Sequence, residues 1–398
     1  MSHRPRRRKT GRSPVLVVVV DCPAFRAKAP KALLAGLVAL CAATAWADWP
    51  FMGHDPQRTG VADQPGPAQL TPAWSVDLGT PVDASPAVVA GNVYAASRAG
   101  RVVALAADSG AELWRAELNA TVVAGLACAD GLLCVGTVEG YLLGLEAATG
   151  AVRWRFRARG PIVGSPLILQ GRVYFGSGDR RVYALDAATG ARAWSYQCPG
   201  EVLAGLAWTD GRLIAADMEG GVCCLDGATG RNLWKARTGL PSEAAPVIAG
   251  QAVIIPCMSP GLGDISRLVC LQVSDGSTRW TQVGKGSVSA TPAVANGMLY
   301  FAALEGYPTN AAVLYGGDLA SGALRWKQGL GLALDTEPVF AAGKLYVATY
   351  DGRVQVRNAA DGAELGAFQT GGKVYCSPAV SGGSLFVGAT DGKLYCLR

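Results

Sequence analysis

The sequence predicts an all-β fold, an eight-bladed β-propeller with four antiparallel strands in each blade. Three observations carry this prediction. Tryptophan recurs at a regular spacing, short runs of Val, Tyr, Leu and Ala alternate with turns of Gly, Asp and Asn, and an isolated strand near the N-terminus matches an incomplete unit at the C-terminus. Self-similarity with a period of about 40 residues and four strands per unit is typical of propeller blades.

The tryptophan spacing defines the repeat. Intervals of 40 and then 46 residues separate Trp74, Trp114, Trp154, Trp194, Trp234, Trp280 and Trp326. Gly366 takes the next slot, in "GAELG", where the first unit has "GAELW". The runs between these markers are four to seven residues long and bounded by turn residues, and no helical period follows the first 47 residues.

Each unit carries one turn with a definite geometry. In the stretch from Asp186 to Gly190, the carboxylate is expected to accept backbone N–H groups, and the glycine to take a positive φ. The tryptophan four residues later lies on the outer strand, where we expect it to fill the wedge between neighbouring blades. These tryptophans, Asp186 and Gly190 are therefore predicted to be structural docking residues.

The two ends of the chain are predicted to close the ring together. The last unit stops after its third strand at Arg398, whereas the strand around Trp74 stands alone as an outer strand. The N-terminal strand would complete the last blade. We therefore predict one propeller domain at residues 70–398, with residues 48–69 packing on the ring.

Residues 1–47 resemble an export leader. Basic stretches precede the apolar run "ALLAGLVAL", and Ala45-Trp46-Ala47 provides a small-x-small cleavage pattern. We expect a periplasmic or secreted protein without a transmembrane span in its mature part. A lipid anchor at Cys41 is not expected, because Leu40 before it is not small. The formal net charge of +6 becomes −2 after residue 47, which argues against nucleic acid as a partner.

Nine of the eleven cysteines follow the leader, and most are predicted to be core residues. Cys224, Cys270 and Cys396 occupy one repeat position, where the first unit has an alanine. A disulfide between Cys128 and Cys134 is not expected, because the predicted hairpin places them on opposite faces. Adjacent residues of a strand also point to opposite faces, which opposes a bond between Cys223 and Cys224.

The chain resembles the pyrroloquinoline-quinone (PQQ) enzyme-like repeat family. The resemblance rests on the phrase from Ala184 to Trp194, which matches the family's Ala-x-Asp-x-x-x-Gly-x-x-x-Trp docking motif, and on "DWPFMGHDPQRTG" from Asp48. It implies two alternatives. One is a scaffold that binds other proteins, as in the outer-membrane assembly protein BamB. The other is a dehydrogenase that uses PQQ and calcium. A polysaccharide-binding module is a third hypothesis.

The residues favour the scaffold. His54 is the only histidine after the leader and lies outside the predicted ring, so no catalytic residue and no metal site are predicted. No cofactor is expected, and most units lack the insertions that build a quinone pocket. A monomer that binds a protein partner in the cell envelope is the interpretation we adopt.

Two insertions offer one candidate partner surface. The fifth and sixth units each carry six extra residues, within 257–266 and 304–316. Long loops on a rigid scaffold often carry recognition. The candidate partner-binding residues there are Met258, Asp264, Tyr307, Asn310 and Tyr315. The mouth of the central channel is the competing site.

Overall fold

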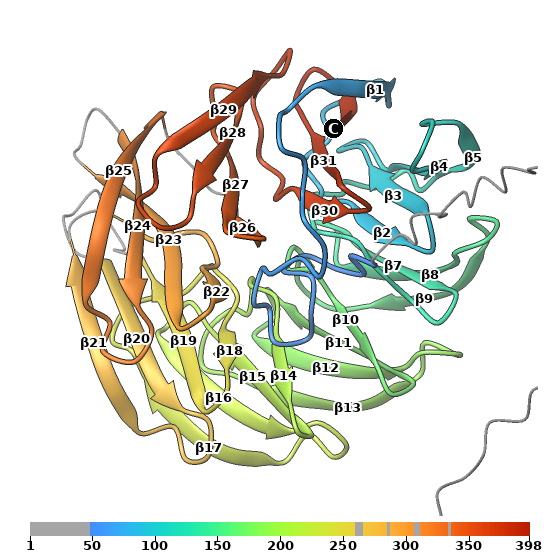
Figure 1. Cartoon of the computed structure of the whole chain (residues 1–398). Coiled ribbons are helices and arrows are strands. Elements are labelled where there is room, and N and C mark those ends of the chain that lie inside the picture. The colour runs from blue at the N-terminus through green and yellow to red at the C-terminus, as the bar shows by residue number, and fades with distance from the viewer. Residues whose placement is uncertain (1–47, 259–265, 285–286, 306–310, 333–335) are drawn as a thin grey trace, which may run out of the picture. The chain divides into compact units, whose positions relative to one another are not determined.

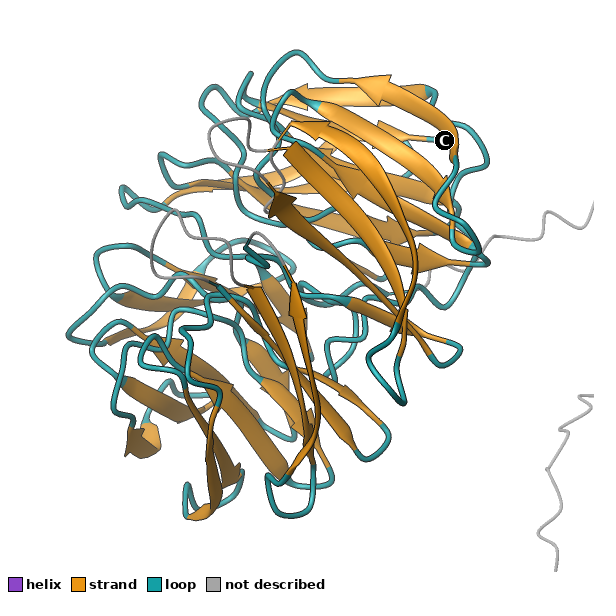
Figure 2. Ribbon diagram, turned by 90° about the vertical axis from the view of Figure 1, so that its left-hand side faces the viewer, coloured by secondary structure: helices purple, strands orange, loops and turns teal. Residues whose placement is uncertain are grey.

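The computed structural model describes residues 48–398 except 259–265, 285–286, 306–310 and 333–335. Eight four-stranded antiparallel sheets follow one another around a ring (Figure 1). Every regular element in this described part is a β-strand (Figure 2). The predicted eight-bladed propeller is therefore confirmed. Within the same residues, no helix has the length and apolarity needed to cross a membrane.

The first four blades each contain four consecutive strands, and the innermost has three residues. Blade one consists of β2 (Ala87–Val89), β3 (Asn92–Ala96), β4 (Arg101–Ala106) and β5 (Glu112–Glu117). Blade two consists of β6 (Ala127–Ala129), β7 (Leu132–Gly136), β8 (Tyr141–Glu146) and β9 (Val152–Arg157). Blade three consists of β10 (Leu167–Leu169), β11 (Arg172–Ser177), β12 (Arg181–Asp186) and β13 (Arg192–Gln197). Blade four consists of β14 (Ala207–Thr209), β15 (Arg212–Ala216), β16 (Gly221–Asp226) and β17 (Asn232–Arg237).

The other four blades repeat this order, except that the last is built from both ends of the chain. Blade five consists of β18 (Val247–Ala249), β19 (Ala252–Cys257), β20 (Ser266–Gln272) and β21 (Thr278–Gly284). Blade six consists of β22 (Ala293–Ala295), β23 (Met298–Glu305), β24 (Ala311–Asp318) and β25 (Leu324–Leu332). Blade seven consists of β26 (Val339–Ala341), β27 (Lys344–Ala348), β28 (Arg353–Asn358) and β29 (Glu364–Gln369). Blade eight consists of β30 (Ala379–Ser381), β31 (Ser384–Gly388), β32 (Lys393–Leu397) and β1 (Pro72–Asp77).

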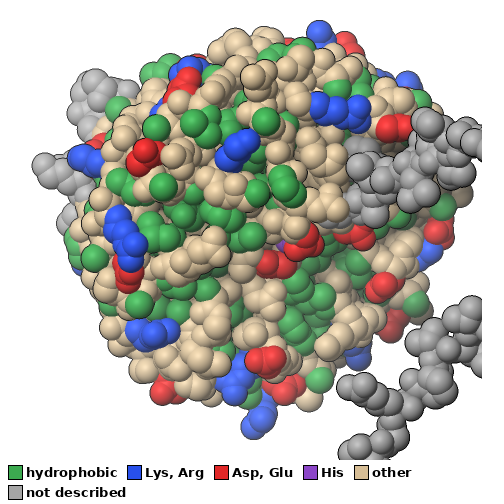
Figure 3. Space-filling view, in the orientation of Figure 1, with side chains coloured by type: hydrophobic (Ala, Val, Ile, Leu, Met, Phe, Trp, Pro, Cys, Tyr) green, Lys and Arg blue, Asp and Glu red, His purple; other side chains and the backbone are tan. Residues whose placement is uncertain are grey.

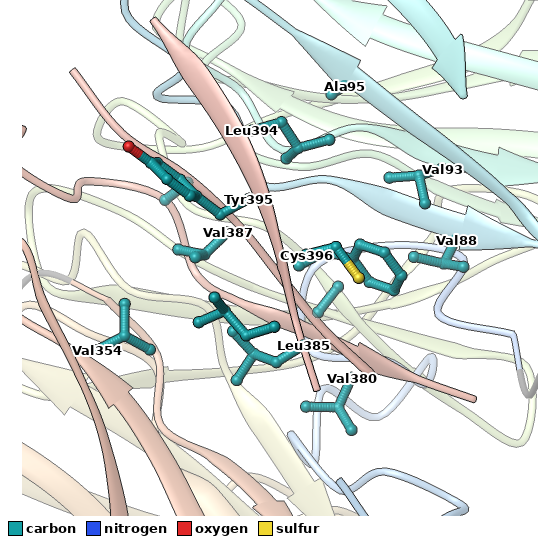
Figure 4. Packing of buried hydrophobic residues seen from close by; sticks show 14 of the residues in the cluster. Val88, Val93, Ala95, Val354, Val380, Leu385, Val387, Leu394, Tyr395 and Cys396 are labelled. Carbon is teal, nitrogen blue, oxygen red and sulfur yellow. The ribbon is translucent and has the colours of Figure 1, made fainter. Parts of the chain in front are cut away.

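The predicted closure of the ring is confirmed. Strand β1 pairs antiparallel with β32, and Trp74 lies opposite Cys396. The innermost strand of blade eight also contacts that of blade one. Figure 4 shows buried side chains of blade eight, such as Leu385 and Leu394, in one cluster with Val93 of blade one and Val354 of blade seven. Apolar burial across this seam therefore joins the two ends of the chain.

The tryptophans join each blade to the next through one repeated contact. The indole Nε1 of Trp154 donates to the carbonyl of Ala187 at 2.9 Å. The ring lies against Gly190, where an added Cβ would stand 2.7 Å from it, and the φ of Gly190 is +70°. The turn before Gly190 is closed by Asp186, whose carboxylate accepts the Thr189 N–H at 3.0 Å. The same indole-to-carbonyl bond is made by Trp74, Trp114, Trp194, Trp234 and Trp280. Trp326 lies against Gly362, but its Nε1 has no hydrogen-bond partner among the described residues.

The small repeat position that cysteine shares with alanine lies directly opposite the tryptophan. Cys224 pairs with Trp234 across the sheet, and the register shifts immediately after it. A small side chain leaves room for the large ring, which explains why these cysteines are fully buried. In blade seven the order of sizes is reversed, because the larger Val356 takes the small position and lies opposite Gly366, which replaces the tryptophan.

The absence of tryptophan at Gly366 has a topological reason. A docking tryptophan needs the turn between the third and fourth strands of the next blade. In blade eight those strands are β32 and β1, which come from opposite ends of the chain, so this turn does not exist. Apart from the two adjacent residues of the chain, no residue has a heavy atom within 4 Å of where a Cβ of Gly366 would be.

The N-terminal segment, residues 48–62, runs along the free edges of the innermost strands. Its backbone exchanges hydrogen bonds with the innermost strands of six blades, at Val88, Cys128, Trp208, Ile248, Val294 and Phe340. An unpaired strand edge is a site for unwanted strand addition, and this segment satisfies part of it. On the face drawn in Figure 3, acidic side chains gather near the centre beside a histidine.

Candidate functional site

Equivalent positions of all eight blades line one cavity, which we call the channel-mouth cavity. It has a volume of about 140 Å³ and is lined by residues that precede the innermost strand of each blade, together with Met52 of the N-terminal segment. Two repeat positions supply most of the lining. The two positions stand two residues apart in the chain. The first contributes Asp83, Val123, Val163, Leu203, Glu243, Ser289 and Tyr375. The second contributes Ser85, Gly125, Gly205, Ala245, Thr291, Glu337 and Ser377.

The cavity has an apolar side and an acidic side. Val123, Val163 and Leu203 come from blades two, three and four, which are consecutive around the ring. Carboxylates come from blades one, five and seven, at Asp83, Glu243 and Glu337. The mouth is therefore amphipathic, although all eight blades share one repeat.

Glu337 is the most constrained of these acids. It is 5% exposed, and its Oε1 has no hydrogen-bond partner within the described residues. Its own N–H donates to Oγ of Ser377 at 3.0 Å. Burial raises the pKa of the Glu337 carboxyl, while a hydrogen bond from Thr291 and the positive charge of Arg58 act in the opposite direction. The cavity therefore contains a buried carboxylate oxygen without a donor.

Arg58 of the N-terminal segment supplies the positive charge near this acid. Its side chain is fully buried, and its Nε donates to the carbonyl of Leu206 at 3.0 Å. Its Nη2 donates to the carbonyl of Ser165 at 2.7 Å, and its Nη1 donates to that of Met52. Burial lowers the pKa of Arg58 to about 10, opposed by Glu337 and by Asp55, so the group stays cationic near neutral pH. Its donors point to carbonyls, which leaves Glu337 Oε1 without one.

Asp83 is a second buried carboxylate of the cavity with one oxygen that lacks a hydrogen-bond partner among the described residues. Its other oxygen forms an ion pair with Nε of Arg98. The Asp83 side chain is 5% exposed whereas that of Arg98 is 50% exposed, so the ion pair reaches from the cavity wall to solvent. Two buried carboxylates of the mouth thus each retain an oxygen that can accept a hydrogen bond.

The candidate residues of the two insertions do not come together as one described surface. Asp264, Tyr307 and Asn310 lie outside the described residues. Met258 is partly exposed after β19, and its N–H donates to the carbonyl of Pro241 at 2.9 Å. Tyr315 is 6% exposed within β24 and stacks on Phe301 with ring centroids 5.0 Å apart.

The expected loop at 304–316 is therefore partly strand. Strand β23 continues to Glu305 and β24 begins at Ala311, so the extra residues lengthen this hairpin. Tyr315 itself lies outside the lengthened part. It occupies the repeat position that Tyr183 has in blade three, opposite Phe301 as Tyr183 is opposite Phe175, and this ordinary third-strand position is buried. The Tyr315 hydroxyl donates to the carboxylate of Glu305.

Sequence reasoning missed the acids of the channel mouth, although the repeat contained the signal. In the four-residue phrase before each innermost strand, the third position is Ser, Gly, Ala or Thr in seven units and Glu337 in one. The first position is acidic at Asp83, Glu243 and Asp335, and the last of these lies outside the described residues. Packing at a buried repeat position does not require a charged residue. A charged residue there is therefore a signal of a functional role.

The cavity does not fit PQQ. Small-molecule sites usually enclose about 300–1,000 Å³, and this cavity is well below that range. PQQ is a flat anion that carries carboxylates, and the described lining contains carboxylates of its own but neither Lys nor Arg. Elsewhere in the described ranges, His, Cys, Asp and Glu side chains do not form a group of three or more that could hold a metal ion.

Comparisons with known proteins agree on the architecture. The family model described as outer membrane protein assembly factor BamB matches residues 67–133, 100–206, 200–256 and 310–398. No curated protein matches the chain. BamB from Moraxella catarrhalis has a similar structure, with a TM-score of 0.70, 22% identity, and coverage of 83% of this chain and 97% of that one.

Two alcohol-oxidising dehydrogenases share the same architecture. Quinohemoprotein alcohol dehydrogenase from Comamonas testosteroni has a TM-score of 0.74 and 17% identity, over 88% of this chain and 80% of that one. A europium-containing methanol dehydrogenase has a TM-score of 0.74 and 13% identity, over 89% and 98% of the two chains. At these identities the structural likeness shows the fold alone.

Proposed function

Because the chain belongs to the family of PQQ-like β-propellers whose model describes the outer membrane protein assembly factor BamB, we propose that it is a non-catalytic binding scaffold of the cell envelope or exterior. The scaffold acts as a monomer and holds a protein partner at its channel mouth. One observation carries this proposal, namely the buried Glu337 oxygen without a donor in a cavity with an apolar wall.

The chemistry of the mouth defines the partner. A cavity of about 140 Å³ accommodates one side chain more readily than a cofactor. A Lys or Arg side chain would supply the donors that Glu337 and Asp83 lack, and its methylene stem would lie against Val163 and Leu203. The partner is therefore a protein segment in which a basic residue stands beside apolar ones.

The substitution Glu337→Gln tests this recognition. We expect at least a tenfold loss of affinity for peptides that place Lys or Arg between leucines, because the charge-assisted bond is lost. Fluorescence anisotropy with labelled peptides measures the affinity. The matched control is Glu219→Gln, which changes an exposed acid away from the cavity and leaves binding unchanged. Equal binding of peptides with Glu in place of the basic residue would contradict the proposal.

The same variant should be more stable than the wild type at neutral pH. Because the pKa of Glu337 is raised in the folded state, folding favours the protonated form, and the charged form costs stability as pH rises through the folded pKa. Glutamine removes this cost. We expect a higher Tm for Glu337→Gln at pH 7 and no increase at pH 4, measured by thermal unfolding. A Tm below that of the wild type at pH 7 would show that the carboxylate stabilises the fold.

The quinone enzyme is tested by titration with PQQ and Ca²⁺. Nine tryptophans follow residue 47, so a bound quinone would quench their fluorescence. We expect no saturable quenching at micromolar PQQ, because the described mouth is small and acidic. Saturable binding at one site would replace the scaffold with the oxidoreductase as the leading function.

A glycan is the second candidate ligand of the mouth. Tyr375 lines the cavity and is 36% exposed, and its ring lies 4.9 Å from that of Tyr350. The two rings are tilted by 54° to each other, and the more exposed Tyr375 offers an apolar ring face with a hydroxyl at its edge, which suits a sugar ring. Binding of soluble glucans that is lost in Tyr375→Ala and kept in Glu337→Gln would favour this alternative.

A further inference from the structure

Two cysteine side chains meet where the connector between blades three and four packs on blade four. Cys198 directly follows β13, and Cys223 lies in β16. Their Sγ atoms are 4.0 Å apart. Both residues line a surface pocket of about 310 Å³, which is separate from the channel-mouth cavity. Neither cysteine has a role in the proposed scaffold function.

This pair differs from the other cysteines after residue 47. Cys198 and Cys223 are 5% and 7% exposed, and the other seven are at most 1% exposed. Cys128 and Cys134 lie on opposite faces of their hairpin, because Cys128 pairs with Leu133. Cys224, next to Cys223, lies beneath Trp234 on the other face of β16. This pair is therefore the least buried of the nine, and both residues line a surface pocket.

We propose that Cys198 and Cys223 are a disulfide-forming pair that is oxidised by thiol–disulfide exchange with a small or protein disulfide. The Cys198 thiolate attacks one sulfur of the oxidant, which forms a mixed disulfide and releases one thiol. The Cys223 thiolate then attacks Sγ of Cys198, so the bond between the two cysteines forms and the second thiol leaves. Two electrons pass to the oxidant, and the two protons from the cysteines go to the released thiolates.

The pocket suits this chemistry. Lys235 and Arg237 line it with the two sulfurs and supply positive charge, which favours a thiolate, while the Asp217 carboxylate in the same lining opposes it. The contact with Cys198, burial and the Asp217 carboxylate raise the pKa of Cys223 well above the usual value. Cys198 lies in the connector that directly follows β13, whereas Cys223 is held within β16, so we take Cys198 as the attacking residue.

The bond would tether a part of the protein that leads to the channel mouth. The connector from Cys198 continues to Leu203 and Gly205, which line the cavity. The two cysteines are 25 positions apart, and closing such a loop restricts the unfolded chain. Oxidation is expected to raise the Tm by about 4 °C.

Mass spectrometry of the purified protein tests the pair directly. The protein is incubated with oxidised glutathione, denatured, alkylated, digested without reduction, and compared with a fully reduced sample. We expect a linked pair of peptides containing Cys198 and Cys223, and two fewer alkylated cysteines than in the reduced sample. The same number of alkylated cysteines in both samples, or a different linked pair, would overturn the proposal.

Two variants separate the bond from a general effect on folding. Cys198→Ser should lose the linked peptides and the difference in Tm between oxidised and reduced protein. Cys224→Ser is the matched control, because it changes the neighbouring buried cysteine on the opposite face, and it should retain both. If Cys198→Ser keeps the oxidative Tm shift, the shift comes from another pair and the assignment is wrong.

Discussion

Replacing Trp154 with alanine is expected to lower the free energy of unfolding by about 3–5 kcal/mol. The indole is 7% exposed, and it is the contact through which blade two holds the turn of blade three. Its removal leaves a cavity against Gly190 and removes the donor to the carbonyl of Ala187. Because each blade contacts mainly its two neighbours, one weakened junction affects the whole ring.

Urea denaturation followed by circular dichroism measures this effect. The matched control is Gly366→Ala, at the same repeat position in blade seven, where the added methyl group meets no heavy atom within 4 Å. We expect its stability to change by less than about 0.5 kcal/mol. A Trp154→Ala protein within about 1 kcal/mol of the wild type would mean that the tryptophans do not hold the blades together.

Replacing Arg58 with methionine is expected to cost about 3–5 kcal/mol. The guanidinium is fully buried and donates to three carbonyls, two in connectors that precede β10 and β14 and one in the N-terminal segment. Methionine preserves much of the apolar stem but leaves these carbonyls without donors. It also removes the positive charge near Glu337, so the buried carboxylate loses its compensation.

A double-mutant cycle separates the two contributions. If Arg58 compensates the charge of Glu337, the variant with both Arg58→Met and Glu337→Gln should lose less stability than the sum of the single changes predicts. Arg58→Lys keeps the charge but reduces the set of donors, so it should lie between wild type and methionine. Additive effects at pH 7 would show that Arg58 stabilises the fold only through its carbonyl contacts.

The blades could be predicted because each is encoded by a local sequence pattern that recurs along the chain. Strand runs, the turn from Asp186 to Gly190 and the spacing of the tryptophans depend on neighbouring residues, and repetition makes the pattern unmistakable. The closing strand around Trp74 could also be predicted, because it supplies the fourth strand that the last unit lacks. The inserted residues of blade six could not be placed, because they can form a loop or lengthen a hairpin, although Tyr315 itself holds the repeat position of Tyr183.

The arrangement of the channel mouth, in contrast, could not be predicted from the sequence. Glu337 was visible in the sequence as an exception to its repeat position, but its meaning depends on Arg58, which is 279 positions away and fully buried. The pairing of Cys198 with Cys223 likewise depends on how the connector folds back on blade four. Neither juxtaposition follows from local propensity.

The sequence alone determined the all-β class, the number of blades and the way the ring closes, because these follow from periodicity and from turns whose geometry is set within a few residues. Only the tertiary structure decided which strand edges the N-terminal segment pairs with, which acids are buried without donors and which two thiols meet. Those features arise where segments far apart in the chain share a low-dielectric interior, and there the cost of burying a polar group depends on every neighbour at once.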